Sequence, residues 1–309
     1  MLSSERVRVA LVQTKPAKGR YVENLATARE AFAELAGDRP QLIVFPEAAF
    51  TGYFLEGAVY DLAFESGDLA GRIAALWRAR GAARHPVDIV AGFYENDGGT
   101  YYNAALYLEI GDAAERIVHV HRKMFLPTYG VFDEERFLSR GRSLRTFETR
   151  FGTIAMLICE DTWHAIMPTI AAIKGARMLI VPSASPGRGL GGDGELESVA
   201  RWKELLRSYA CEHGVYILYA GLAGFEGGKG MTGTSCVIDP RGETIVAAPL
   251  LGAAIVRASI DAREIDLARA SLPLLGDLQA VLPDLLRDPA LPVGPREREP
   301  LDTPASAPE

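Results

Sequence analysis

Three side chains that could take part in acyl transfer each follow an apolar, strand-like run of the sequence. Glu47 follows residues 42–45, Lys123 ends the run IVHVHRK, and Cys159 ends the run GTIAMLIC. A carboxylate, an ammonium group and a thiol are what acyl transfer through a thioester needs: a base, a cation for the oxyanion and a nucleophile. Taken singly, they are more simply explained as a solvated acid, a surface cation and an inert buried thiol. The prediction of a catalytic site rests on the occurrence of all three groups in one chain.

Cys159 is the predicted nucleophile. A thiol with an ordinary pKa of about 8.5 is mostly protonated at neutral pH, so it needs a base or a stabilising cation before it can attack. We predict that Glu47 takes the proton, and that Lys123 stabilises the thiolate and the oxyanion of the tetrahedral intermediate. The backbone N–H of Glu160 would complete the oxyanion hole if a helix or turn begins there. This chemistry calls for no cofactor and no metal.

The segments around these residues resemble a known family. FPE at Glu47, HRKMFLPTYGVFDEERF at Lys123 and LICEDTW at Cys159 look, in this order, like the three catalytic signatures of the nitrilase superfamily, the carbon-nitrogen hydrolases. The resemblance extends from about residue 6 to about residue 261. It implies a four-layer α-β-β-α sandwich with two mixed sheets, subunits that pair, and a Glu-Lys-Cys triad with a second glutamate. Glu134 is our prediction for that glutamate, with Glu135 as its rival.

Within the superfamily, LPTYGVFDE and Cys-Glu-Asp resemble the glutaminase domain of glutamine-dependent NAD synthetases more than true nitrilases. The chain ends too early for a synthetase domain and shows no SGGxDS loop, so we expect a stand-alone amidase. It would hydrolyse a small carboxamide to a carboxylate and ammonia through a cysteinyl thioester. The alternatives are a nitrilase or an N-carbamoyl amide hydrolase on the same triad, or a non-catalytic binding protein on this fold.

Further residues are expected to border the pocket, although ordinary packing would also explain them: Tyr53, Tyr129, Trp163, Ser183 and Ser185. A different enzyme class remains open, a Cys-His hydrolase that uses Cys159 with His164 or His213. That alternative leaves Lys123 unexplained, and the sequence lacks the recognised cysteine-protease signatures.

Two other groups of residues point less clearly to a site. His119 and His121 alternate on a predicted strand and would share a face, but spacing places no third metal ligand beside them. Arginines occur at positions 136, 140, 142, 145 and 150, with Asp133, Glu134, Glu135 and Glu148 among them. Such mixing of signs is typical of a solvated, salt-bridged face.

Hydrophobic periodicity predicts the elements that must position these residues. Strands are expected over 6–14, 41–45, 87–93, 101–109, 116–122, 152–159, 178–181 and 215–223, with a hairpin over 236–246. Helices are expected over 24–36, 71–83, 165–174 and 195–212. Several neighbouring strands are joined by loops too short for a crossover helix, so the sheets must be mixed. We expect an α/β fold: a hydrolase domain over residues 1–265, then a helical extension and Pro-rich tail over 266–309.

Composition excludes several function classes. The 309 residues carry 33 Lys+Arg against 40 Asp+Glu, a formal net charge of −7, which does not favour nucleic-acid binding. Three cysteines without a CxxC pair fit a reducing, cytoplasmic setting. The N-terminus does not resemble a signal peptide, and we expect no membrane span. The expected partners are therefore a small-molecule amide and, by the resemblance, a second subunit in a homodimer or higher homo-oligomer.

Overall fold

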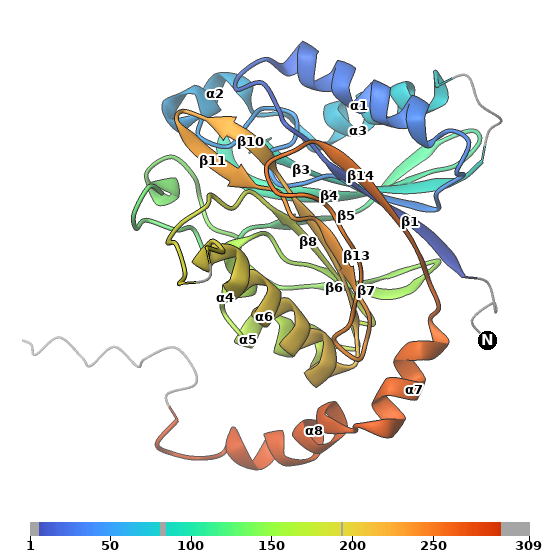
Figure 1. Cartoon of the computed structure of the whole chain (residues 1–309), viewed down its shortest axis with the longest axis vertical. Coiled ribbons are helices and arrows are strands. Elements are labelled where there is room, and N and C mark those ends of the chain that lie inside the picture. The colour runs from blue at the N-terminus through green and yellow to red at the C-terminus, as the bar shows by residue number, and fades with distance from the viewer. Residues whose placement is uncertain (1–5, 81–84, 193, 292–309) are drawn as a thin grey trace, which may run out of the picture.

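Two six-stranded β-sheets lie face to face between outer helices in the computed structural model, which describes residues 6–80, 85–192 and 194–291 (Figure 1). Helices α1 and α3 cover the outer face of one sheet, and α5 and α6 cover the outer face of the other. The predicted four-layer α-β-β-α architecture is confirmed.

The first sheet holds the strands that precede Glu47 and Lys123. Its spatial order is β14 (Ala254–Ile260), β1 (Val7–Gln13), β2 (Leu42–Val44), β3 (Val87–Asp97), β4 (Thr100–Ile110) and β5 (Glu115–Arg122). β1, β2 and β3 run parallel, whereas the other pairs are antiparallel. Its covering helices are α1 (Tyr21–Leu35) and α3 (Ser66–Arg78).

The second sheet holds the strand that precedes Cys159. Its order is β13 (Thr244–Ala247), β12 (Cys236–Ile238), β9 (Tyr216–Gly221), β8 (Met178–Ser183), β7 (Gly152–Met156) and β6 (Thr146–Thr149). β7, β8 and β9 are parallel, so this sheet is mixed too. Its covering helices are α5 (Ile166–Ile173) and α6 (Glu197–His213).

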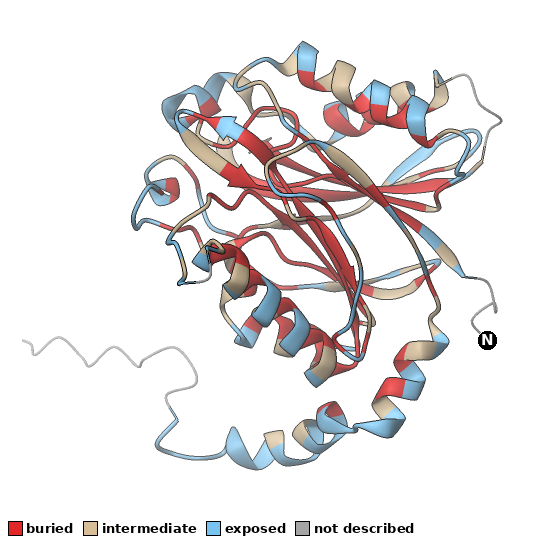
Figure 2. Ribbon diagram, viewed as in Figure 1, coloured by how far each residue is buried: buried red, intermediate tan, exposed pale blue. Residues whose placement is uncertain are grey.

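Buried residues concentrate on the two facing sheets and on the sides of the helices that face them (Figure 2), and they form large apolar clusters. Leu11 and Val44 of the first sheet belong to the same buried cluster as Ile154 and Leu218 of the second. Residues that alternate with these face outward, so β2 and β8 are apolar on both faces and read as continuous hydrophobic runs. This double burial explains why polar side chains gather where these strands end.

Shorter elements complete the chain: the 3-10 turns Glu56–Ala58 and Glu134–Arg136, α2 (Val59–Leu62), α4 (Glu160–Trp163), the hairpin β10 (Ala223–Glu226) and β11 (Lys229–Thr232), α7 (Arg263–Ser271) and α8 (Leu274–Leu285). Among the described residues, no helix has the length and apolarity needed to span a bilayer.

Most predicted elements are confirmed within a few residues, including the hairpin at 236–246. The helix predicted over 71–83 instead begins at Ser66 and ends at Arg78. The strand predicted over 152–159 ends at Met156, although Leu157 and Cys159 still donate their N–H groups to carbonyls of β8, and the chain turns at Cys159. Strands β6 and β14 and the hairpin of β10 and β11 were not predicted. Of the predicted tail, residues 292–309 lie outside the described residues.

Candidate active site

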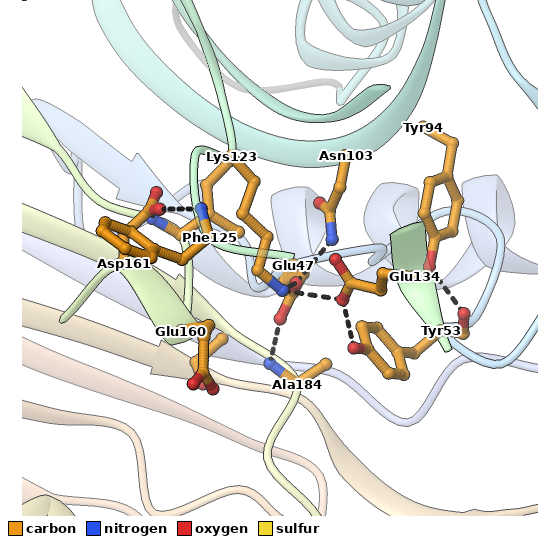
Figure 3. Close-up of polar contacts among 12 residues, drawn as sticks. Glu47, Tyr53, Tyr94, Asn103, Lys123, Phe125, Glu134, Glu160, Asp161 and Ala184 are labelled. Carbon is orange, nitrogen blue, oxygen red and sulfur yellow. Dashed lines mark hydrogen bonds and ion pairs between the residues drawn. The ribbon is translucent and has the colours of Figure 1, made fainter. Parts of the chain in front are cut away.

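The ends of four strands converge on one buried polar cluster (Figure 3). Glu47 follows β2, Lys123 follows β5, Cys159 follows β7, and Ala184 follows β8. The first two belong to one sheet and the last two to the other, so the cluster lies where the sheets face each other. Functional groups of α/β folds are commonly presented at such strand ends.

Glu47 has no exposed surface, and both of its carboxylate oxygens accept hydrogen bonds. Oε1 accepts from Lys123 Nζ at 2.9 Å and from Asn103 Nδ2 at 2.6 Å. Oε2 accepts from the backbone N–H of Ala184 at 2.7 Å. The next residue, Ala48, has a φ of +53°, a strained conformation for a non-glycine residue. The carboxylate is therefore fixed in position from three directions.

Lys123 joins Glu47 to a second carboxylate. Its Nζ donates to Glu134 Oε1 at 2.7 Å, and the hydroxyl of Tyr53 donates to the same oxygen. Glu134 is buried, whereas Glu135 is exposed, so Glu134 is the glutamate that contacts the lysine. A pocket of about 250 Å³ opens beside Glu134 and Tyr53.

Burial and the neighbouring charges together set the pKa values of Lys123 and Glu134. Burial alone would lower the pKa of Lys123, but the carboxylates of Glu134 and Glu47 outweigh it and raise that pKa well above its usual value. Burial raises the pKa of Glu134 to about 7, since it outweighs the nearby Lys123 ammonium, and the Glu47 charge adds to the rise. The lysine therefore stays protonated at neutral pH.

Cys159 occupies a strained turn between β7 and α4. Its φ is +44° and its ψ is −100°, and its backbone N–H donates to the carbonyl of Pro182 at 3.0 Å. Burial and the Glu47 charge raise the pKa of the thiol well above its usual value, while Lys123 and a hydrogen bond with Ser183 lower it. The resting side chain is thus a thiol, which requires a base in order to react.

Asp161 ties the segment after Lys123 to the segment around Cys159. Its Oδ1 accepts from the backbone N–H groups of Met124 and Phe125, at 2.9 and 3.0 Å. Its Oδ2 lies 2.9 Å from His121 Nε2 and 3.1 Å from the N–H of Ile158. This fully buried carboxylate connects the two sheets beside the cluster.

The other predicted pocket residues lie at different distances from the cluster. Ser183 is buried and lies close enough to the Cys159 thiol to lower its pKa, and the Tyr53 hydroxyl donates to Glu134. The hydroxyl of Tyr129 donates to the Glu160 carboxylate at 2.9 Å, at an exposed position.

Two predicted residues pack around an indole instead. The Ser185 hydroxyl accepts from Trp202 Nε1 at 2.9 Å, and the ring of Trp163 lies 5.4 Å from that of Trp202. The structure therefore joins Ser185 and Trp163 to each other through Trp202, and among the described residues no hydrogen bond links either side chain to Glu47, Lys123 or Cys159.

Three groups that position the cluster by hydrogen bonds were not predicted from the sequence. Asn103 donates to Glu47, Asp161 joins the two segments, and the N–H of Ala184 fixes the second Glu47 oxygen. A signal existed for Asn103, because it is the single amide of β4 and directly precedes the apolar run over residues 104–108. No sequence signal marks Ala184, since its contribution is a backbone group.

The histidines do not form a catalytic pair with the thiol. The ring of His164 stacks on Phe125 at 3.7 Å, and His213 Nε2 lies 3.3 Å from the Thr169 hydroxyl. Within the described residues, no hydrogen bond joins either ring to Cys159. The same residues contain no cluster of His, Cys, Asp and Glu that could hold a metal ion, and His121 is bonded to Asp161 instead.

The chain is similar in sequence to known proteins over most of its length. The chain is 32% identical over 265 residues to a glutamine-dependent NAD(+) synthetase of Thermotoga maritima, a match that covers 84% of this chain and 43% of that protein. It therefore spans less than half of that relative's length. It is 29% identical to a 2-oxoglutaramate amidase of Bacillus subtilis, over 88% of this chain and 97% of the relative.

A solved structure of a carbon-nitrogen hydrolase from Helicobacter pylori G27 has the same fold. It superposes with a TM-score of 0.79 at 23% identity and covers 92% of this chain and 99% of that one. The sequence profile of the carbon-nitrogen hydrolases matches residues 8–270. The chain therefore belongs to the carbon-nitrogen hydrolase family.

Proposed function

We propose that this protein hydrolyses a small carboxamide to a carboxylate and ammonia through a thioester on Cys159. The observation that carries the proposal is a buried, protonated Lys123 held between Glu47 and Glu134 at the strand ends where the Cys159 thiol also lies. A cation, a base and a nucleophile in one desolvated cluster suit acyl transfer, because electrostatic stabilisation is strong where water is excluded.

In the first step, Glu47 takes the proton from the Cys159 thiol as the sulfur attacks the amide carbonyl carbon. The carbonyl oxygen becomes an oxyanion, which Lys123 and the backbone N–H of Glu160 stabilise. Collapse of this intermediate breaks the C–N bond, and the nitrogen leaves as ammonia with the proton from Glu47. A positioned base is needed because burial keeps the thiol protonated in the resting enzyme.

In the second step, Glu47 takes a proton from a water molecule that attacks the thioester carbonyl. The second tetrahedral intermediate collapses with cleavage of the C–S bond, and the proton returns from Glu47 to the sulfur. Glu134 acts by holding Lys123 and balancing its charge. Tyr53 positions Glu134, and Ser183 positions the thiol. We propose that Tyr129, Trp163 and Ser185 border the space beside Cys159 that receives the acyl group of the substrate.

The proposed substrate class rests on one of the relatives that the chain matches along nearly their whole length, a 2-oxoglutaramate amidase. A nitrilase or an N-carbamoyl amide hydrolase would use the same triad. The test is therefore ammonia release over a panel of aliphatic amides, ω-amides of amino and keto acids, N-carbamoyl compounds and nitriles. Turnover of nitriles or N-carbamoyl compounds in preference to all amides would contradict the amidase assignment.

Intact mass spectrometry tests the thioester. Rapid quenching with the best substrate should give an acyl adduct on the wild type, and Cys159→Ala should give no adduct and no turnover. Cys211→Ala is the matched control, because Cys211 lies half-buried on α6, and it should keep both. Wild-type rates in Cys159→Ala would contradict the mechanism.

Replacement of His164 or His213 should leave activity intact. Loss of activity in either variant would favour a Cys-His enzyme.

The proposal extends to a cytoplasmic homodimer or higher homo-oligomer. Exposed apolar residues on α8, namely Leu274, Val281 and Leu285, support a subunit contact there. We propose separately that the hydrolase domain spans residues 1–265 and that an extension begins at residue 266.

The oligomeric state can be measured directly. Light scattering on the full chain would contradict the oligomer if it gave the mass of a single chain.

A further inference from the structure

A second, strongly basic pocket opens beside β5. It has a volume of about 330 Å³ and lies between that strand and the loop over residues 139–145. Four arginines line it, together with His119 and Ser143: Arg122, Arg140, Arg142 and Arg145. No carboxylate is among the lining residues. This concentration of positive charge contrasts with the chain's formal net charge of −7.

Three of these arginines have free guanidinium groups. Arg122 is paired with Glu95 at 2.5 Å and Asp97 at 2.6 Å. In contrast, Arg140, Arg142 and Arg145 are exposed and make no ion pair with any residue of the described ranges. The sequence-based prediction of a salt-bridged face is therefore wrong for these three, although Arg136 and Arg150 do pair with Asp133 and Asp88. Unpaired arginines that face one cavity are available to an anion.

The backbone of the arginine loop is already held in place. Gly141, between Arg140 and Arg142, donates its N–H to the carbonyl of Lys123 at 2.7 Å. A Cβ atom at Gly141 would lie 2.0 Å from the carbonyl oxygen of Arg122, so only glycine permits this close approach. A loop fixed in this way loses little further backbone entropy when a ligand binds.

His119 supplies an unused polar atom next to the arginines. Its Nε2 is buried and has no hydrogen-bond partner, while its ring lies 4.8 Å from that of Phe147. Burial, helped by the nearby His121 and Arg145, lowers the pKa of His119 to about 4. The ring is therefore neutral at pH 7, and an N–H at Nε2 can donate to an acceptor oxygen in the pocket. Buried polar atoms without partners are rare in folded proteins.

We propose that this pocket binds the phosphate group of a small phosphorylated molecule. Guanidinium groups form forked hydrogen bonds that match phosphate oxygens, and several converge here with the Ser143 hydroxyl and His119. The pocket volume is near the lower end for small-molecule sites, which suits a compact metabolite. A single concave pocket on a negatively charged chain does not fit an extended nucleic acid.

Isothermal titration calorimetry on the full chain, in phosphate-free buffer at fixed ionic strength, tests the proposal. The probes are ribose 5-phosphate, inorganic phosphate and, as the uncharged control, ribose. We expect both phosphates to bind and ribose not to bind. Tighter binding of ribose 5-phosphate identifies a phosphorylated metabolite as the ligand, whereas equal binding identifies free phosphate.

Arg142→Gln combined with Arg145→Gln should weaken phosphate binding about 10-fold or more. Both side chains are exposed and unpaired, so the variant should fold, and its melting temperature verifies this. Arg116→Gln, on β5 but outside the pocket, is the matched control and should bind as the wild type does.

NMR spectra of the histidine ring nitrogens test the role of His119. Addition of phosphate should shift a histidine signal in the wild type, and His119→Phe should lack that shift. The absence of binding in the wild type, or equal binding in the double variant and the control, would overturn the proposal.

Discussion

A methyl group at Gly92 would lie 2.5 Å from the Cα atom of Glu47. The same methyl group would lie 2.4 Å from the carbonyl oxygen of Pro46. The backbone of β3 and the segment that follows β2 are therefore in direct contact, and Ala49 donates its N–H to the Gly92 carbonyl at 3.2 Å. The position of the proposed base depends on a residue that has no side chain.

Gly92→Ala should consequently impair catalysis. The extra methyl group must displace the Glu47 backbone, and a shift of about 1 Å at a catalytic group costs about 100-fold in rate. Overpacking should also cost about 1–3 kcal/mol of stability. The measurement is kcat on the best amide together with the free energy of unfolding. Gly71→Ala is the control. A Cβ atom at this position of α3 would have no atom within 4 Å outside its own helix backbone, so activity should be unchanged. Wild-type activity in Gly92→Ala would show that Glu47 tolerates displacement.

Replacement of Glu134 should change how stability depends on pH. Its pKa is raised from 4.5 to about 7, chiefly by burial. Between these values the folded state binds more protons than the unfolded state, so this group's contribution to stability falls as the pH rises. Denaturant unfolding of wild type and Glu134→Gln at pH 5 and pH 7.5 measures the effect. We expect the variant to gain stability relative to the wild type at the higher pH, and a pH-independent difference would contradict the raised pKa.

Asp161→Asn should destabilise the fold and slow catalysis together. The carboxylate accepts hydrogen bonds from four groups, whereas an amide would direct N–H donors at two of them. Each buried donor left without an acceptor costs about 1–3 kcal/mol. Unfolding measurements and kcat on the same preparation check both effects. Asp277→Asn, at an exposed position on α8, should change neither, and an unaffected kcat in a stable Asp161→Asn would remove Asp161 as a positioning residue.

The resting enzyme should contain no Cys159 thiolate at neutral pH. Burial and the Glu47 charge raise the pKa of this thiol, and Lys123 only partly compensates. Thiolate absorbance in the ultraviolet should therefore be equal in wild type and Cys159→Ala at pH 7. The same comparison with Cys211→Ala controls for the loss of an ordinary thiol. A thiolate signal lost only with Cys159 would indicate a preformed ion pair and remove the need for Glu47 as the base.

The elements and their order could be predicted from the sequence because hydrophobic periodicity is local. The apolar run that precedes Glu47, and the one that precedes Cys159, indicate buried strands whatever their partners are. Acidic, basic and thiol groups at strand ends then suggested the chemistry. The strand β14 escaped prediction because its seven residues alternate weakly, and its partner β1 lies at the other end of the chain.

Tertiary structure alone decided which groups meet. Glu134 reaches Lys123 while its neighbour Glu135 faces solvent, since the short turn at that position directs only one side chain inward. The Ala184 N–H meets a carboxylate 137 residues earlier in the chain. Pairing over such distances depends on how two sheets pack face to face, and no periodicity within one segment encodes it. Residue types and strand ends thus came from the sequence, whereas hydrogen-bond partners and pKa shifts came from burial between the sheets.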